Sequence, residues 1–171
     1  MRKMNNNQQF GFINGIYVGE AENGIPNGKG KIAWENDNYY EGDFLDGSFH
    51  GYGIFHMTDF IHAEGIWSKH NFIDGRAVYG DTMKCSGCEP GAVYEGRFEQ
   101  FLCVGKGKII RTNGEIYEGE ILNGKAHGKG KLTLSDGTVI EGAWTNGEKE
   151  QKYTDDDYEI SGGDKRFFDY C

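Results

Sequence analysis

A short pattern recurs along most of this chain, and its spacing restricts the possible fold more than any other feature. In residues 117–137, YEGEILNGKAHGKGKLTLSDG, glycine follows the first tyrosine by two positions, Asn-Gly by six and seven, and two further glycines by eleven and thirteen. The same frame begins at Tyr17, Tyr40, Ala63, Tyr94, Tyr117 and, as a half unit, Ile140. The steps between these starts are 23, 23, 31, 23 and 23 residues. A fixed step in this range indicates a repeat architecture.

Each unit has the sequence pattern of a β-hairpin. We number a unit from its first residue, which is position 0. Position +2 is glycine in all six units, and position +4 is mostly aromatic. The residues at +4 are Ala21, Phe44, Trp67, Phe98, Ile121 and Trp144. This alternation is typical of a β-strand. The dipeptides that follow, such as Asn23-Gly24 and Asp46-Gly47, tolerate positive φ and favour a reversal of the chain.

The second half of a unit alternates as well, but its glycine and large apolar residues fall at the odd positions +13 and +15. Residues directly opposite each other in an antiparallel pair project to the same face. Even positions of the first strand should therefore pair with odd positions of the second, with position numbers that sum to an odd value near 15 or 17. Rings at 0 and +4 then lie over glycines, which would otherwise weaken a strand.

The opposite face should carry charges of both signs. Glutamate stands at +1 in five units, and lysine is common at +12 and +14. The glutamates are Glu41, Glu64, Glu95, Glu118 and Glu141, and the lysines are Lys29, Lys31, Lys106, Lys108, Lys129 and Lys131. Exposed ion pairs contribute roughly 0–1 kcal/mol each, so we expect them to serve solubility and register more than stability.

The pattern resembles the MORN repeat. Units that begin at Tyr17, Tyr40 and Tyr117 match that repeat almost position for position, those at Tyr94 and Ile140 match with losses, and the resemblance covers roughly residues 14–147. It implies an all-β fold, an elongated single-layer antiparallel sheet of consecutive hairpins. It also implies a non-enzymatic scaffold or adaptor for protein partners, often in cytoskeletal, ciliary or membrane-associated assemblies. Some members of the family are reported to contact acidic phospholipids.

The chain divides into three parts. Residues 1–9 are polar and should be disordered. Residues 10–147 form the repeat array, interrupted by an irregular insertion near 81–92. Residues 148–171 leave the repeat and should form a tail that caps the last strand, since repeat arrays are commonly capped. The alternative is that this tail lies in the aromatic groove as a bound peptide.

Charge and hydropathy narrow the class of partner and the location. The net charge of −9 disfavours unspecific binding to nucleic acid. The sequence holds no 18-residue apolar run, and MRKMNNNQQF has no apolar signal segment. These features predict a cytoplasmic, reducing location, and the resemblance suggests association with the cytoskeleton or a cilium.

The ring-bearing face supplies the candidate partner-binding residues, because aromatic side chains dominate interface energetics. They are Tyr17, Tyr40, Phe44, Trp67, Tyr94, Phe98, Tyr117 and Trp144. The third unit has lost its tyrosine and precedes the insertion, so Trp67 and Phe98 should be less covered than the other rings. The partner would be a helical or extended protein segment. The alternative is an acidic phospholipid bound by Lys29, Lys31, Lys106, Lys108, Lys129 and Lys131.

No residue pattern indicates catalysis or a cofactor. The Gly-Lys runs have neither the spacing nor the following helix of a phosphate-binding loop. Cys85 and Cys88 have metal-like spacing, but a zinc site would need Cys103, His62, His70 or Cys171 to complete it. We therefore expect Cys85 and Cys88 to be reduced and free of metal.

Overall fold

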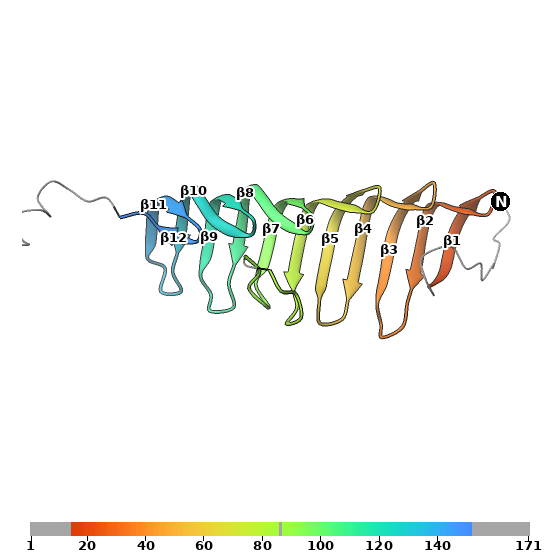
Figure 1. Cartoon of the computed structure of the whole chain (residues 1–171), viewed down its shortest axis with the longest axis horizontal. Helices are drawn as coiled ribbons and strands as arrows, with labels where there is room; N and C mark the ends of the chain where they lie inside the picture. The colour runs from red at the N-terminus through yellow and green to blue at the C-terminus, as the bar shows by residue number, and fades with distance from the viewer. Residues whose placement is uncertain (1–14, 86, 152–171) are drawn as a thin grey trace, which may run out of the picture.

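Residues 15–85 and 87–151, which the computed structural model describes, form one twelve-stranded sheet (Figure 1). The strands are β1 (Ile16–Glu22), β2 (Ile25–Ala33), β3 (Tyr39–Leu45), β4 (Ser48–Met57), β5 (Ile61–Ser68), β6 (Asn71–Tyr79), β7 (Val93–Glu99), β8 (Leu102–Ile110), β9 (Ile116–Leu122), β10 (Lys125–Thr133), β11 (Val139–Thr145) and β12 (Glu148–Lys149). Each strand pairs only with its neighbours in sequence. The predicted all-β sheet of consecutive hairpins is confirmed. No helix that could cross a membrane occurs in this part of the chain.

The predicted register is also confirmed in the regular units. Tyr40 pairs with Phe55 and Gly42 with Gly53, so the paired positions sum to 15. Beyond the glycines the register shifts, and Asp43 pairs with His50, whose positions sum to 13. The shift is a β-bulge that leaves extra residues on the second strand, and the glycine at +11 lies in it with positive φ, 55° at Gly51. Sequence reasoning assigned no role to this glycine.

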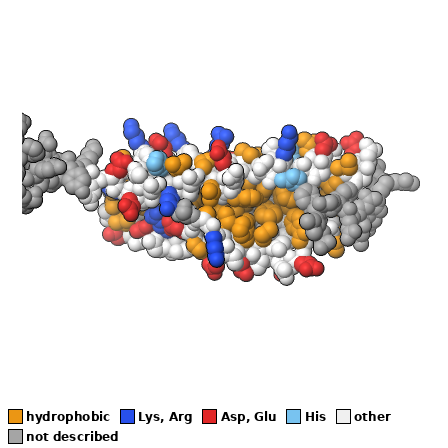
Figure 2. Space-filling view, viewed as in Figure 1, with side chains coloured by type: hydrophobic (Ala, Val, Ile, Leu, Met, Phe, Trp, Pro, Cys, Tyr) orange, Lys and Arg blue, Asp and Glu red, His pale blue; other side chains and the backbone are white. Residues whose placement is uncertain are grey.

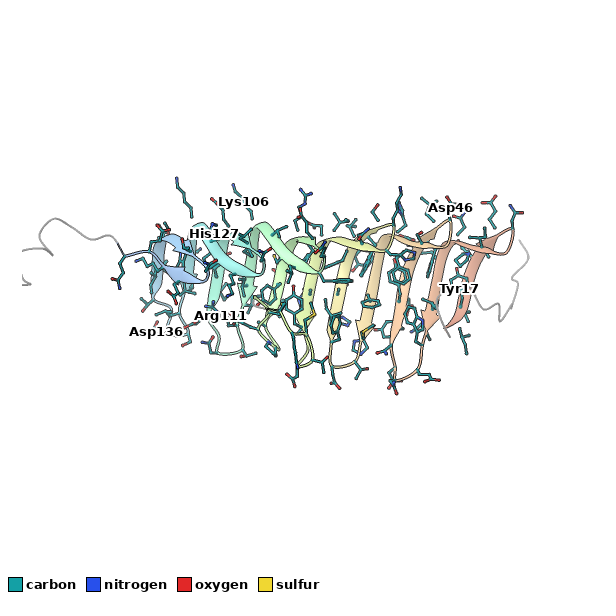
Figure 3. All side chains as sticks on the ribbon, viewed as in Figure 1. Tyr17, Asp46, Lys106, Arg111, His127 and Asp136 are labelled. Carbon is teal, nitrogen blue, oxygen red and sulfur yellow. A yellow bond between two sulfur atoms is a disulfide. The ribbon has the colours of Figure 1, made fainter. Side chains whose placement is uncertain are left out.

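The bulges bend the sheet, as such irregularities do in antiparallel pairs. Figure 1 shows the strands turning over at the upper side of the view, where the hairpin turns lie. The lower side holds the loops that connect one unit to the next, and Asp136 marks one of them in Figure 3. The sheet is therefore concave along its length. We call the face that carries positions 0, +4, +9, +13 and +15 the concave face, and the opposite one the charged face.

Tyrosine at position 0 joins the bulge to the glycines. In the fifth unit, the ring of Tyr117 lies over Gly130, where an added Cβ would meet that ring. Its hydroxyl shares one proton between the carbonyl oxygens of Glu120 at 2.8 Å and His127 at 3.1 Å. A Cβ on Gly119 would in turn meet the Cα of Gly130. The repeat thus needs glycine at +2 and +13 for close packing of backbone and ring.

Hydrogen bonds also join adjacent units. The amide of position +7 in a hairpin turn donates to the carbonyl oxygen of position +9 in the preceding unit. These bonds are Gly47 to Pro26 at 2.9 Å, His70 to Phe49 at 3.1 Å, Gly124 to Cys103 at 2.9 Å and Gly147 to Ala126 at 2.9 Å. The indole Nε1 of Trp67 also donates to the carbonyl oxygen of Gly53 at 3.0 Å. These bonds join the first unit to the second, the second to the third, the fourth to the fifth and the fifth to the half unit, and such contacts between neighbours stabilise repeat proteins.

The third unit is one residue shorter than the others. Ala63 pairs with Ala77 and Gly65 with Gly75, so its paired positions sum to 14. Gly75, at +12, consequently takes the place that the +13 glycine has in the other units. The unit keeps the backbone contact between paired glycines, because a Cβ on Gly65 would meet the Cα of Gly75.

Residues 80–92 connect β6 to β7 and pack against later units. A Cβ on Gly87 would meet the backbone of Asn123, so this connection touches the hairpin turn of the fifth unit. The hydroxyl of Tyr94 donates to the carbonyl oxygen of Gly87 at 3.0 Å and accepts from the amide of Glu89 at 3.0 Å. Glu89 also pairs with Arg111 at 3.1 Å. The connection is thus fixed to three different elements of the array.

The expectation that Cys85 and Cys88 are reduced is wrong in this structure, where the two form a disulfide. The amide of Cys88 donates to the carbonyl oxygen of Cys85 at 3.3 Å, which closes a tight turn. That turn brings the two Cα atoms to 5.3 Å, within the range that a disulfide requires. A local turn, rather than a pattern of several cysteines, therefore makes the pairing possible.

Candidate functional site

All eight rings proposed as partner-binding residues lie on the concave face, as the parity of the repeat predicts. Their exposed fractions are 5 % or less, from 0 % at Tyr40 and Tyr94 to 5 % at Trp144. The expectation that Trp67 and Phe98 are less covered than the others is wrong, because each is 1 % exposed. Their role in binding stays a prediction. These rings form the packed floor of the concave face, and a partner would first meet the residues above them.

Phe101 explains why the middle of the floor is covered. It stands in the turn between β7 and β8 with φ of 64°, a strained conformation for an aromatic residue. Its ring lies 6.0 Å from that of Trp67 and 6.1 Å from that of Phe55. The hydroxyl of Tyr79 donates to its carbonyl oxygen at 2.6 Å. The sequence signal was a phenylalanine at +7, where other units have glycine or histidine.

Half-buried hydrophobic side chains rest on this floor and form what we call the central apolar patch. The patch consists of Trp34, Phe55 and Phe101, whose rings follow one another at 6.4 and 6.1 Å, and Phe60 and Met83 are likewise partly open to solvent and packed against the buried core. Trp34 and Phe55 contact edge to face, with ring centroids 6.4 Å apart. Figure 2 shows hydrophobic side chains gathered over the middle strands of this view. Contiguous exposed apolar surface of this kind marks an interaction site more often than isolated side chains do.

Position +9 also belongs to the floor, and sequence reasoning missed it. Phe49, Phe72 and Cys103 occupy this position, with exposed fractions of 5 %, 2 % and 0 %. Phe49 stacks on Tyr40 with centroids 3.8 Å apart. The place of this position on the concave face could have been predicted, because +9 is odd, as are +13 and +15, which lie on the same face. Burial raises the pKa of the Cys103 thiol to about 12, so this cysteine is protonated and unreactive at neutral pH.

The charged face carries the expected cross-strand pairs. Lys31 lies 3.0 Å from Glu41, Lys131 lies 2.9 Å from Glu118, and Lys29 lies 2.5 Å from Asp43. All of these groups are at least partly exposed. In Figure 3 the side chain of Lys106 projects away from the sheet at the upper edge. The lysines therefore lie at the surface, and several of them are matched by a carboxylate.

The lysine row is interrupted in the middle of the charged face. The second unit has Tyr52 and Ile54 at the lysine positions, and the third has Asp74 and Arg76 there. A shallow hollow of about 570 Å³ lies at this point, lined by Tyr52, Glu64, Asp74, Arg76 and Glu95 among others. The six candidate lysines thus form two separate groups with an acidic hollow between them.

Neither the cysteines nor any group of three ligand side chains forms a metal centre in residues 15–85 and 87–151. No three histidine, cysteine, aspartate or glutamate side chains gather there in a way that could hold a metal ion. Cys85 and Cys88 are joined to each other, and Cys103 is buried, so the three do not form a zinc site. The proposed disordered segment 1–9 and the proposed C-terminal cap lie outside the described residues, apart from the start of the tail at 148–151.

Comparison with known families agrees with the geometry. The model of the MORN repeat matches residues 17–39, 40–59, 94–116 and 117–139, which are more than half of the 171 residues. It passes over the shortened third unit and the connection that follows, where the register and the turn residues depart from the pattern. No curated protein matches the sequence. The matched units are the hairpins with tyrosine at position 0, and the chain belongs to the MORN repeat family.

Proposed function

We propose that the chain is a non-enzymatic scaffold that binds a segment of a protein partner on the central apolar patch. The observation that carries this proposal is the patch itself, half-buried rings supported by a fully packed aromatic floor. A partner side chain that covers these rings removes apolar surface from water, at roughly 25 cal/mol per Å². The floor is held by hydrogen bonds within and between units, so little ordering is required on binding.

A helical or extended segment fits this surface best. The patch runs across strands, from Trp34 after β2 to Phe101 in the turn before β8, so its long direction follows the array. A segment laid along it would place successive apolar side chains on successive units. Binding by anchors on one side of a helix or strand is a common mode of peptide recognition. We further propose, on the family resemblance, that this partner belongs to a cytoskeletal or ciliary assembly.

Binding of acidic phospholipid through the lysines is the alternative function, and the charged face gives it less support. Lipid attraction needs clustered bases without compensating acids. Here Lys29, Lys31 and Lys131 are paired with carboxylates, and the row is broken by the acidic hollow. Co-sedimentation with vesicles containing phosphatidylserine, at two salt concentrations, separates the two functions. If the lysines bind lipid, the chain should co-sediment with the vesicles, and less of it should do so at the higher salt concentration.

The scaffold function is tested by comparing proteins captured by three forms of the full chain from a native lysate. The forms are the wild type, a patch variant with Phe55→Ser and Phe101→Ser, and a charged-face variant with Glu64→Ala and Lys108→Ala. We expect the wild type and the charged-face variant to capture the same proteins. The patch variant should fail to capture them. Circular dichroism must first show that all three are folded.

Two outcomes would contradict the proposal. Capture that survives in the patch variant and disappears in the charged-face variant would move the binding surface to the opposite face. Vesicle binding without any protein captured specifically by the wild type would favour the lipid function.

A further inference from the structure

A pair of histidines faces solvent on the charged face, outside the lysine row. His56 on β4 and His62 on β5 are direct partners across the two strands. Side chains of such partners project to the same face and approach closely. Their ring centroids are 5.5 Å apart, and the two Nδ1 atoms are 3.4 Å apart. Both residues are partly exposed.

This pair is specific to one place in the array. The equivalent pairs elsewhere in the described sheet are Ala33 with Tyr39, Val78 with Val93, Ile110 with Ile116 and Thr133 with Val139, none of which can supply two imidazoles. The histidines therefore do not follow from the repeat pattern. Sequence reasoning considered His62 only as a ligand for a site at the cysteines.

The separation of the two Nδ1 atoms suits a shared metal ion better than a direct hydrogen bond. A good hydrogen bond to nitrogen or oxygen spans about 2.7–3.2 Å, so 3.4 Å is long. Zinc lies about 2.0–2.1 Å from a histidine nitrogen. Two nitrogens at that distance from one ion and 3.4 Å apart subtend about 110° at the ion, which is close to the tetrahedral angle.

We propose that His56 and His62 form a two-histidine site for a divalent transition metal ion of the zinc type, through their Nδ1 atoms. Imidazole suits zinc, nickel and copper, whereas calcium and magnesium prefer oxygen. No third histidine, cysteine or carboxylate of the described residues completes the site. Two positions on the ion are therefore left for water or for a donor from a bound partner.

The surroundings of the pair agree with ligation by neutral imidazoles. Burial lowers the pKa of His62, His56 and Arg76 lower it further, and only Glu64 acts in the opposite direction. Neutral imidazole is the form that binds a metal ion. The ring of Tyr39 packs on that of His56 with centroids 5.5 Å apart, which restricts its orientation. Tyr39 from β3, Glu64 from β5 and Arg76 from β6 lie near the pair, and Lys31 from β2 lies over the ring of Tyr39.

The test is calorimetric titration of the full chain with Zn²⁺ at neutral pH. We expect one ion to bind per chain, and His56→Asn or His62→Asn to weaken binding at least about tenfold, because each removes one of two ligands. His50→Asn and His127→Asn are the matched controls and should bind as the wild type does.

Cysteines are the main competing ligands, so the titration is repeated with Cys85→Ser, Cys88→Ser and Cys171→Ser combined. Zinc binding that persists in this variant, with the imidazole resonances of His56 and His62 shifting in NMR spectra, would support the site. No uptake at about 1 mM Zn²⁺, or uptake that is lost only with the cysteines, would overturn it. Unchanged affinity in folded His62→Asn would overturn it as well.

Discussion

The hydroxyl of Tyr117 reaches across its own hairpin and donates to the carbonyl oxygen of His127 at 3.1 Å, while the ring lies over Gly130. The same arrangement recurs in the second unit, where Tyr40 donates to His50 at 3.2 Å and lies over Gly53. The hydroxyl of the tyrosine binds the bulge and its ring packs on the glycine pair. The tyrosine at position 0 therefore fixes both the bend and the packing of a unit. The tyrosine and the glycines of the repeat therefore depend on each other.

Replacing Gly119 with valine should destabilise the sheet by about 1–3 kcal/mol, the usual cost of overpacking. A Cβ at this position would meet the Cα of Gly130 and the carbonyl oxygen of Lys129, and backbone atoms cannot move aside cheaply. Urea unfolding followed by circular dichroism measures the change. Thr133→Val, a β-branched exchange on the charged face of β10, is the control and should change stability by less than about 0.5 kcal/mol. Equal stability of Gly119→Val and wild type would show that the proposed close packing is wrong.

The hairpin units, their register and the two faces were predictable because each residue type recurs at the same position several times. Tyr40 over Gly53 follows directly from the parity of the two half units. The burial of the rings was not predictable in this way, because it depends on the bend at Gly51 and on contacts between units. Phe101 is a single departure from the pattern, and no repeated position indicates that it covers Trp67.

The connection between β6 and β7 was predictable as an interruption but not as a packed element. The extra residues near 81–92 follow from the longer step between units. The contact of Gly87 with the turn at Asn123 joins residues far apart in sequence, and only the curvature of the sheet brings them together. The pairing of Gly75 with Gly65 was not predictable either, because the third unit is one residue shorter and Gly75 therefore falls at +12 and not at +13.

The stability of the sheet should fall between about pH 10 and pH 12. Burial raises the pKa of Tyr17 from 10.0 to about 12, and that of Tyr94 to about 12. Because the folded chain holds these protons more tightly than the unfolded chain, their contribution is complete below pH 10 and is lost as the pH rises through 12. Urea unfolding at several alkaline pH values measures this slope. Tyr94→Phe, which has no phenol to ionise, should show a smaller slope, and an equal slope would contradict the assignment.

Reduction of the Cys85–Cys88 disulfide should lower the free energy of unfolding by up to about 2 kcal/mol, since a ring this short restricts the unfolded chain only a little. The connection should keep its place, because Tyr94 and Arg111 also hold it. Thermal unfolding with and without dithiothreitol measures the effect, and Cys85→Ser with Cys88→Ser should behave as the reduced protein does. If the unfolding temperature of the wild type does not change with dithiothreitol, and the protein has two more free thiols than the disulfide allows, the disulfide is absent in solution.

The central claim is that the partly exposed rings of the patch contact the partner and that the buried rings support them. The dissociation constant of the captured partner, measured by titration calorimetry, tests it most directly. Phe101→Ala should weaken binding by about 2 kcal/mol or more, as truncation of a central aromatic residue does, and Lys108→Ala should change it by less than about 0.5 kcal/mol. Trp67→Ala and Phe98→Ala should weaken binding too, provided that they remain folded. An unchanged dissociation constant for folded Phe101→Ala, together with a large loss for Lys108→Ala, would contradict the account.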